Sequence, residues 1–265
     1  MEAEMTGKVA LVTGASRGIG AAVARAFREA GARVALAARS AEELEWLADG
    51  LGAVDGGALA IPADVSDPMA VEAMVARAVE KFGRLDYACN NAAGGGHAPT
   101  PLAAVPVEAF DSGVAVSLRG VFLSMRAEIP AMLESDGGGA IVNMSSTAGS
   151  QAVGGLGTYV AAKHGVEGLT KVAALDYAAE GVRVNAVAPG PILTDNLKRA
   201  GAGAREAAAK AMPMRRVGTP EEVAAAVVWL CSEAAGFVTG TTLTIDGGKL
   251  AGTPPFRVKA AASAG

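Results

Sequence analysis

The sequence predicts one α/β domain in which helices cover both faces of a parallel sheet, the doubly wound arrangement. Two observations carry this prediction. Short apolar runs, such as Val9–Val12 and Val182–Val187, alternate along the chain with longer amphipathic stretches. These runs lack an alternation of polar and apolar residues, which is typical of strands that are buried on both faces. A glycine-rich turn also follows the first apolar run directly. The 265 residues fit a single domain spanning 1–265.

The apolar runs predict a seven-stranded parallel sheet, with strands at 9–12, 33–37, 58–61, 85–89, 140–144, 182–187 and 242–245. Helices are expected at 19–30, 41–51, 68–82, within 107–133, at 159–179 and from Pro220 onward. Ser40 and Asp67-Pro68 supply helix start signals. The Ala- and Gly-rich segment 200–210 is either a mobile flap or a plain surface helix. Residues 249–265 are expected to form a loosely held tail.

Composition limits the classes of function. Hydrophobic residues make up 51% and charged residues 19%, with a net charge of −4, which suits a folded core and argues against disorder. We find no long basic stretch, no signal-peptide pattern and no apolar run long enough to span a bilayer, so neither nucleic acid nor a membrane is an expected partner. Cys89 and Cys231 stand in apolar runs without ligand spacing. They predict buried thiols, a cytoplasmic location and no metal site.

The turn Thr13-Gly14-Ala15-Ser16-Arg17-Gly18-Ile19-Gly20 lies between the first strand and the first helix. Glycine lets the backbone turn sharply and approach a pyrophosphate, while the helix N-terminus offers unpaired N–H groups. The turn therefore predicts a dinucleotide site formed by Gly14, Ser16, Arg17, Gly18, Ile19 and Gly20.

The residues after the second strand favour NADP(H) over NAD(H). NAD-binding proteins usually place an acid about 20 residues beyond the turn, on the ribose 2′-hydroxyl. Ala38 occupies that place here, and Arg39 follows it. Arg39 and Arg17 can both pair with a 2′-phosphate, which a carboxylate would repel.

Residues that follow the other strands are expected to complete the cofactor site, because the carboxyl ends of parallel strands share one edge. Asp64 is expected beside the adenine or as a turn residue. Asn90 is expected to brace the ribose or neighbouring backbone, or to have a structural role. The remaining expected contacts are Val65, Asn91, Ala92, Pro189, Gly190, Ile192 and Thr194, with Pro189-Gly190-Pro191 alternatively a rigid loop.

Tyr159 and Lys163 are the predicted proton-transfer pair. Their spacing of four places both side chains on one helix face, and a nearby ammonium is expected to lower the pKa of the phenol. Tyr159 can then give a proton to a carbonyl oxygen or take one from an alcohol. Ser146, 13 residues earlier, is expected to hold the substrate oxygen, with Ser145 facing the other way.

Together these residues resemble the short-chain dehydrogenase/reductase family over nearly the whole chain. The resemblance rests on Thr13-Gly14-x-x-x-Gly18-x-Gly20, Asn90-Asn91-Ala92, Ser146, Tyr159-x-x-x-Lys163, Pro189-Gly190 and Ile245-Asp246-Gly247-Gly248. It implies a Rossmann-type sheet, a Tyr proton donor, a Lys that also holds the nicotinamide ribose, a Ser that positions substrate, and a homotetramer. Similar members include 3-oxoacyl-carrier-protein reductases and broad ketone or sugar dehydrogenases.

Two positions depart from the family pattern. Ala93 stands where the family usually has Gly, and Ser117 stands where it usually has a catalytic Asn. In the family, the backbone carbonyl of that Asn holds a water in a proton relay to the Lys. Since Ser117 keeps the carbonyl and its hydroxyl can bond the backbone, we expect it to serve as the fourth catalytic member.

The expected substrate pocket is mixed but mostly apolar, which favours a ketone or acyl thioester over a free sugar. Its residues are Gly95, His97, Thr147, Gln151, Leu156 and Met212. The predicted function is NADP(H)-dependent interconversion of a ketone and a secondary alcohol. The alternatives are an NAD(H)-dependent sugar or alcohol dehydrogenase of the same fold, a sugar epimerase or dehydratase, and a non-catalytic dinucleotide sensor.

Overall fold

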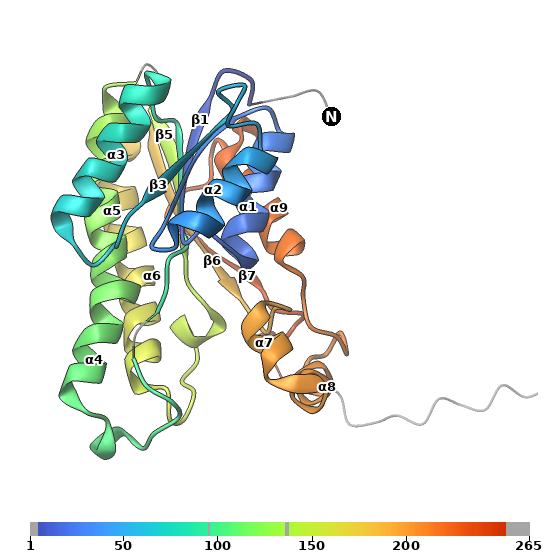
Figure 1. Ribbon diagram of the computed structural model, residues 1–265. Coiled ribbons are helices and arrows are strands. Elements are labelled where there is room, and N and C mark those ends of the chain that lie inside the picture. The colour runs from blue at the N-terminus through green and yellow to red at the C-terminus, as the bar shows by residue number, and fades with distance from the viewer. Residues whose placement is uncertain (1–4, 95, 136–137, 253–265) are drawn as a thin grey trace, which may run out of the picture.

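The computed structural model describes residues 5–94, 96–135 and 138–252, and its centre is one parallel sheet (Figure 1). The strand order is β3-β2-β1-β4-β5-β6-β7, and all pairs run parallel. The strands are β1 (Val9–Thr13), β2 (Arg33–Ala38), β3 (Ala58–Pro62), β4 (Tyr87–Asn90), β5 (Gly139–Met144), β6 (Val182–Pro189) and β7 (Thr242–Ile245). The predicted seven-stranded sheet is confirmed, with every strand end within two residues of its prediction.

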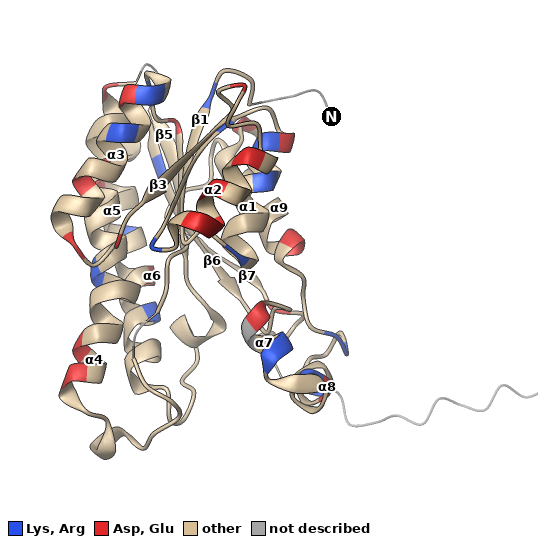
Figure 2. Cartoon of the chain, viewed as in Figure 1, with Lys and Arg blue, Asp and Glu red and all other residues tan. Residues whose placement is uncertain are grey.

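Helices cover both faces of the sheet, as predicted. On one face lie α1 (Gly18–Glu29), α2 (Ala41–Gly50) and α9 (Pro220–Cys231). On the other lie α3 (Pro68–Phe82), α5 (Gly120–Leu133) and α6 (Gly157–Tyr177). Figure 1 shows α4 (Val107–Val114), α7 (Asp195–Arg199) and α8 (Gly201–Ala211) beyond the sheet at its lower end. The segment predicted as a flap or a surface helix is thus the helix α8, and Figure 2 shows basic residues on both α7 and α8.

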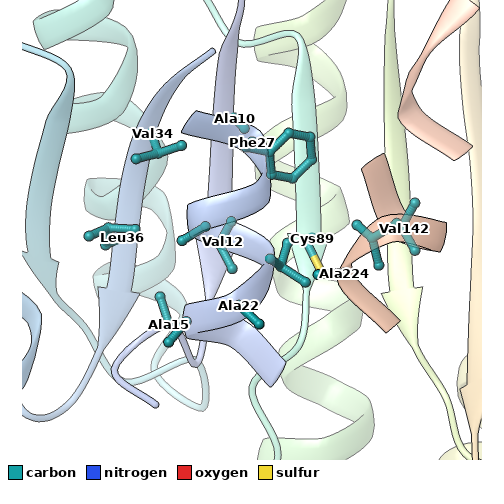
Figure 3. Close-up of a cluster of buried hydrophobic side chains, with 14 of the residues drawn as sticks. Ala10, Val12, Ala15, Ala22, Phe27, Val34, Leu36, Cys89, Val142 and Ala224 are labelled. Carbon is teal, nitrogen blue, oxygen red and sulfur yellow. The ribbon is translucent and has the colours of Figure 1, made fainter. Parts of the chain in front are cut away.

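The core on the α1 and α9 side combines alanines with larger aliphatic side chains and the ring of Phe27. Figure 3 shows Phe27, on α1 in front of the strands, in one buried cluster with Ala10, Val12 and Cys89. Ala22 and Ala224, from α1 and α9, are 5% and 2% exposed. Alanines at these contacts let both helices lie close to the sheet. Cys89 and Cys231 are buried free thiols, as the apolar runs predict.

The helix predicted within 107–133 is interrupted. Residues Ala115–Arg119 form a π-helical turn between α4 and α5, and turns of this kind are frequent at functional sites. Gly120 begins α5 in direct contact with Val65, since a Cβ at Gly120 would lie 2.9 Å from Val65 Cγ2. Helical periodicity alone does not reveal such a change, because the apolar pattern continues through the wider turn.

The two residues predicted to begin helices differ in their hydrogen bonds. Asp67 caps α3, and its carboxylate accepts a hydrogen bond from Met69 N at 2.9 Å. Ser40 is the N-cap residue of α2, as predicted, but its side chain forms no capping hydrogen bond. Of the predicted tail 249–265, Lys249 donates to Thr147 Oγ1 at 3.1 Å, and residues 253–265 lie outside the described residues.

Candidate active site

Most residues predicted to bind the cofactor line one cleft of about 320 Å³. It lies at the carboxyl ends of β1 and β4, where the strand order reverses, and doubly wound sheets bind ligands at that point. The predicted residues in its lining are Gly14, Ser16, Arg17, Gly18, Ile19, Arg39, Asp64, Val65, Asn91, Ala92 and Thr194. Val116 and Asp195 also line it. Sequence reasoning missed both, since the π-helical turn that carries Val116 leaves no local signal.

The glycine-rich turn has the shape that a pyrophosphate requires. Gly14 and Gly18 have φ angles of 63° and 57°, a region that favours glycine. A Cβ at Gly20 would lie 2.2 Å from the carbonyl oxygen of Gly14, so only glycine lets α1 begin this close to the turn. The N-terminus of α1 then points its free N–H groups into the cleft, and the residues present fit a dinucleotide.

Asn91 ties the glycine-rich turn to the end of β4. Its side-chain amide donates to the carbonyl oxygens of Thr13 and Gly14, both at 3.1 Å. The Thr13 hydroxyl accepts hydrogen bonds from the backbone N–H groups of Asn91 and Ala92, also at 3.1 Å. These four bonds fix two walls of the cleft relative to each other.

Two guanidinium groups face the cleft without partners of their own. Arg17 and Arg39 line it, and neither forms a hydrogen bond or ion pair with another described residue. Ala38, the last residue of β2, lies beside Arg39 in the lining. Asp64 Oδ1 accepts hydrogen bonds from Ser66 N and Oγ at 2.9 and 2.7 Å. These bonds, aided by Arg39, lower the pKa of Asp64. Asp64 thus forms the expected turn and lines the cleft, and its place beside an adenine stays a prediction.

The predicted cofactor-binding residues at and after the end of β6 do not all line the cleft. Thr194 lines the cleft, and a Cβ at Gly18 would lie 3.5 Å from Thr194 Cγ2. Pro189 pairs with Ile245 inside the sheet, and Gly190 packs against Asp246. Ile192 is buried and bridges to Gly218. The structure therefore brings only Thr194 of this predicted group into the cleft lining, while the other three support the loop that carries it.

Tyr159 and Lys163 lie on the same face of α6, as their spacing predicts. Lys163 Nζ is 5.6 Å from the centroid of the Tyr159 ring. The lysine is 1% exposed, and Nζ donates to the carbonyl oxygen of Met144, at the end of β5, at 2.6 Å. This bond holds the lysine between α6 and the edge of the sheet.

The electrostatics of the pair differ from the prediction. Burial raises the pKa of Tyr159, with a smaller opposite effect from its hydrogen bond with Ser146. Burial also lowers the pKa of Lys163 to about 8. In the chain by itself, desolvation therefore outweighs the attraction between ammonium and phenolate. Without the nucleotide, Lys163 does not make the phenol more acidic. The lowering of the Tyr159 pKa by Lys163 together with an oxidised nicotinamide ring stays a prediction.

The two serines after β5 face different partners. Ser146 lies next to the Tyr159 hydroxyl, where it offsets part of the rise in the pKa of the phenol, and it accepts from Ala148 N at 3.1 Å. Ser145 instead donates to Glu167 Oε1 on α6, at 2.9 Å. The structure thus places Ser146, and not Ser145, beside Tyr159.

Ser117, in the π-helical turn, holds the loop that follows β4. Its hydroxyl donates to Gly94 O at 3.2 Å and accepts from Gly94 N at 3.3 Å. It is 3% exposed. One side chain thus satisfies both backbone groups of Gly94, which a hydroxyl can do because it is both donor and acceptor.

We expect replacement of Ser117 by Asn to leave turnover similar or higher, because an amide also offers a donor and an acceptor to Gly94. Ser117→Ala removes both bonds and should lower the free energy of unfolding by about 1–2 kcal/mol. Steady-state kinetics and urea unfolding of both variants test this. A large loss of turnover in the Asn variant would contradict the role given to Ser117.

The predicted substrate pocket is divided between different places. His97 and Leu156 line a cavity of about 290 Å³ together with Ser117 and Tyr159. Met212 lines a second cavity of about 300 Å³ near the end of β7. The remaining members lie apart: Thr147 is buried beneath Lys249, Gln151 is exposed, and Gly95 lies outside the described residues.

Asn90 does not face the cleft, so the expectation that it braces the cofactor is wrong. It is 2% exposed, and its amide donates to Glu128 Oε2 at 2.9 Å and to Asn143 Oδ1 at 3.1 Å. Successive side chains of a strand point to opposite faces, which turns Asn90 toward α5 and leaves Asn91 for the cleft. Burial raises the pKa of Glu128 to about 7.

Glu128→Gln should stabilise the protein increasingly as pH rises. The folded-state pKa of about 7 lies above the usual value of 4.5 for a glutamate. The stability that neutral Glu128 provides is therefore complete below about pH 4.5 and is lost by about pH 7. The advantage of the variant should grow by about 2 kcal/mol between pH 5.5 and 8.5. Urea unfolding at both pH values measures it. Glu80→Gln, an exposed site on α3, is the control, and an equal pH dependence in wild type and Glu128→Gln would disprove the argument.

The fold and the cleft first define a class. A parallel doubly wound sheet with a glycine-rich turn at the switch point is typical of dinucleotide-binding proteins, and the Tyr-Lys-Ser group at its edge is suited to acid-base chemistry. A family model described as "Enoyl-(Acyl carrier protein) reductase" matches residues 14–249. The chain belongs to the short-chain dehydrogenase/reductase family.

Curated relatives match nearly the full length of the chain. A protein of Streptomyces virginiae named A-factor type gamma-butyrolactone 1'-reductase (1S-forming) is 44% identical, covering 92% of this chain and 96% of the relative. The D-threitol dehydrogenase of Mycolicibacterium smegmatis is 42% identical, over 92% and 93%. The cyclohexanol dehydrogenase of Acinetobacter sp. is 41% identical, over 93% and 96%.

The family and these relatives make the chain an oxidoreductase that acts on secondary alcohols or ketones with a nicotinamide cofactor. Membership of this family makes an oxidoreductase a better interpretation than the non-catalytic sensor or the sugar epimerase or dehydratase. Within the described residues, no helix is long and apolar enough to cross a membrane.

Proposed function

We propose that this protein is an NADP(H)-dependent reductase of ketones, acting on a small ketone or an acyl thioester with a 3-oxo group. The observation that carries the choice of cofactor is the pair Arg17 and Arg39 at the cleft, neither with a side-chain partner among the described residues. Ala38 supplies no carboxylate to receive a ribose 2′-hydroxyl. Two unpaired guanidinium groups suit a 2′-phosphate dianion.

The glycine-rich turn and the N-terminus of α1 would hold the pyrophosphate, and Asp64 and Val65 would border the adenine. Asn91, Ala92 and Thr194 would line the path toward the nicotinamide. When bound, the nicotinamide ring gives or accepts the hydride, and its oxidised form adds the positive charge that favours ionisation of Tyr159. The pre-formed shape of the turn keeps the cost of ordering this site low.

Proton transfer would be carried out by the residues of the chain. The Tyr159 hydroxyl donates its proton to the substrate oxygen in reduction and takes it back in oxidation. Ser146 holds the same oxygen and orients it toward Tyr159. Lys163, with a pKa lowered to about 8, can exchange a proton near neutral pH, and the Ser117 carbonyl would hold the water that returns protons to it.

Titration of the purified protein with NADPH and NADH, followed by a ketone panel, tests the proposal. We expect tighter binding of NADPH by at least about 10-fold, which corresponds to about 1.4 kcal/mol, and reduction of at least one ketone, with cyclohexanone a reasonable first choice given the named relatives. Preference for NADH would instead favour an NAD(H)-dependent sugar or alcohol dehydrogenase. Binding without turnover on any substrate would refute the reductase.

Two further properties belong to this proposal. Exposed apolar side chains on the long helices, including Phe122, Val172 and Leu175 at 47%, 55% and 83%, support a homotetramer that covers them, since single chains rarely expose such groups together. Light scattering of the purified protein tests it, and a monomer at micromolar concentration would contradict it. The buried free thiols Cys89 and Cys231 support a reducing, cytoplasmic location.

A further inference from the structure

The cavity beside Tyr159 is formed where three segments meet. The loop after β4 contributes Gly94, Gly96 and His97, the helical stretch around the π turn contributes Gly113 and Ser117, and the start of α6 contributes Leu156, Thr158 and Tyr159. Its volume is about 290 Å³, and its lining is mostly backbone and apolar atoms. Tyr159 belongs to this lining, so a ligand in the cavity would lie next to the proposed proton donor.

Gly94 and Gly96, which precede His97, are each packed against the helical segments. A Cβ at Gly113 would lie 2.4 Å from Thr158 Cγ2 and 3.0 Å from Gly96 Cα. The glycine therefore allows the loop to rest against α4 and the first turn of α6. Ser117 adds two hydrogen bonds to Gly94, so the loop is held from two sides.

His97 presents an unused acceptor. Its Nδ1 lies 2.8 Å from the carbonyl oxygen of Ala98, and since a carbonyl only accepts, Nδ1 carries the proton. In the neutral ring Nε2 is then an acceptor. Nε2 is buried and has no hydrogen-bond partner among the described residues.

Thr158 presents a second unused group in the same cavity lining. The residue is 3% exposed, and its Oγ1 is buried without a partner in the described part of the chain. Buried polar atoms are nearly always hydrogen-bonded, and leaving one unpaired is unfavourable. Two such atoms in the lining of one cavity next to the predicted proton donor indicate that a polar ligand group completes them.

We propose that the substrate carries a hydroxyl close to its reacting carbonyl, and that this hydroxyl donates to His97 Nε2 and accepts from Thr158 Oγ1. A hydroxyl is the simplest group that is both donor and acceptor. The substrate class is then a hydroxy ketone in the direction of reduction and a diol in the direction of oxidation. This inference rests on the proposed function, and it makes His97 and Thr158 specificity-determining residues.

Matched ketones test the inference with whichever nicotinamide nucleotide the protein prefers. We expect kcat/KM for 2- or 3-hydroxycyclohexanone to exceed that for cyclohexanone by about 10-fold or more, since sites built to bond a hydroxyl discriminate against analogues that lack it. His97→Leu and Thr158→Val should each bring this ratio toward one. His164→Leu, which removes the exposed histidine of α6, should keep the ratio.

A binding measurement separates recognition from chemistry. Calorimetry on the protein loaded with the reduced nucleotide, which cannot oxidise an alcohol, should show cyclohexanediol binding about 10-fold more tightly than cyclohexanol. The same two substitutions should remove the difference, and His164→Leu should not.

The possible outcomes distinguish a failure of the proposed function from a failure of the proposed hydroxyl recognition. If no ketone is reduced with either nucleotide, the proposed function fails. If cyclohexanone is reduced but neither hydroxy ketone is preferred and the diol binds no better than cyclohexanol, the proposed function stands and the inference is overturned. A preference that survives both His97→Leu and Thr158→Val would also overturn it, since other residues would then hold the hydroxyl.

Discussion

Replacing Tyr159 by Phe should lower kcat about 1,000-fold while leaving nucleotide affinity within a factor of about two. The change removes one oxygen and keeps the ring beside Lys163, whose Nζ is 5.6 Å from the ring centroid. The phenol is the proposed proton donor, and a phenylalanine ring has no acidic proton to give to the substrate oxygen. Stopped-flow or steady-state kinetics, together with a nucleotide titration, measure both quantities.

Tyr177→Phe is the matched control, because it makes the same chemical change at the other end of α6. It should behave as wild type. Retained turnover in Tyr159→Phe would refute the assigned role. Equal losses of nucleotide affinity and turnover would show instead that the substitution damages the cleft.

Ala38→Asp should reverse the cofactor preference. A carboxylate at the end of β2 would stand in the cleft lining beside Arg39, where it repels a 2′-phosphate and can accept a hydrogen bond from a 2′-hydroxyl. Repulsion at this range is worth about 2–3 kcal/mol, so the Kd for NADPH should rise roughly 30- to 150-fold. The Kd for NADH should fall or stay the same, and fluorescence titration follows both.

Ala38→Asn controls for the size of the new side chain without its charge. It should change the affinity for NADPH far less than Ala38→Asp does. If the Asp and Asn variants lose NADPH equally, sterics and not charge control the site. If Ala38→Asp leaves NADPH binding intact, the 2′-phosphate does not lie near Arg39 and the argument for NADP(H) fails.

The cofactor cleft could be predicted closely because its signals are local. A glycine-rich turn between a strand and a helix requires particular φ values and a close approach, and Gly14, Gly18 and Gly20 each satisfy such a requirement in the structure. The ends of parallel strands share one edge, so Arg39 and Asn91 follow from the order of the elements alone.

The substrate side could not be predicted equally well. His97, Leu156 and Met212 were all predicted to line one substrate pocket, but they line two separate cavities. Which loop rests against which helix depends on contacts such as Gly113 with Thr158, formed between segments far apart in the chain. Composition predicted a mostly apolar pocket. Only the packing shows that Nε2 of His97 and Oγ1 of Thr158 are buried without a hydrogen-bond partner among the described residues.

By itself, the sequence determined the seven-stranded parallel sheet, the place of the dinucleotide turn and the order of Ser146, Tyr159 and Lys163, because periodicity, glycine and spacing act over a few residues. Only the tertiary structure decided the direction of side chains and their electrostatics. It turned Asn90 toward Glu128 and raised the pKa of Tyr159 through burial. Burial and pairing arise when distant segments pack together, and no local pattern records them.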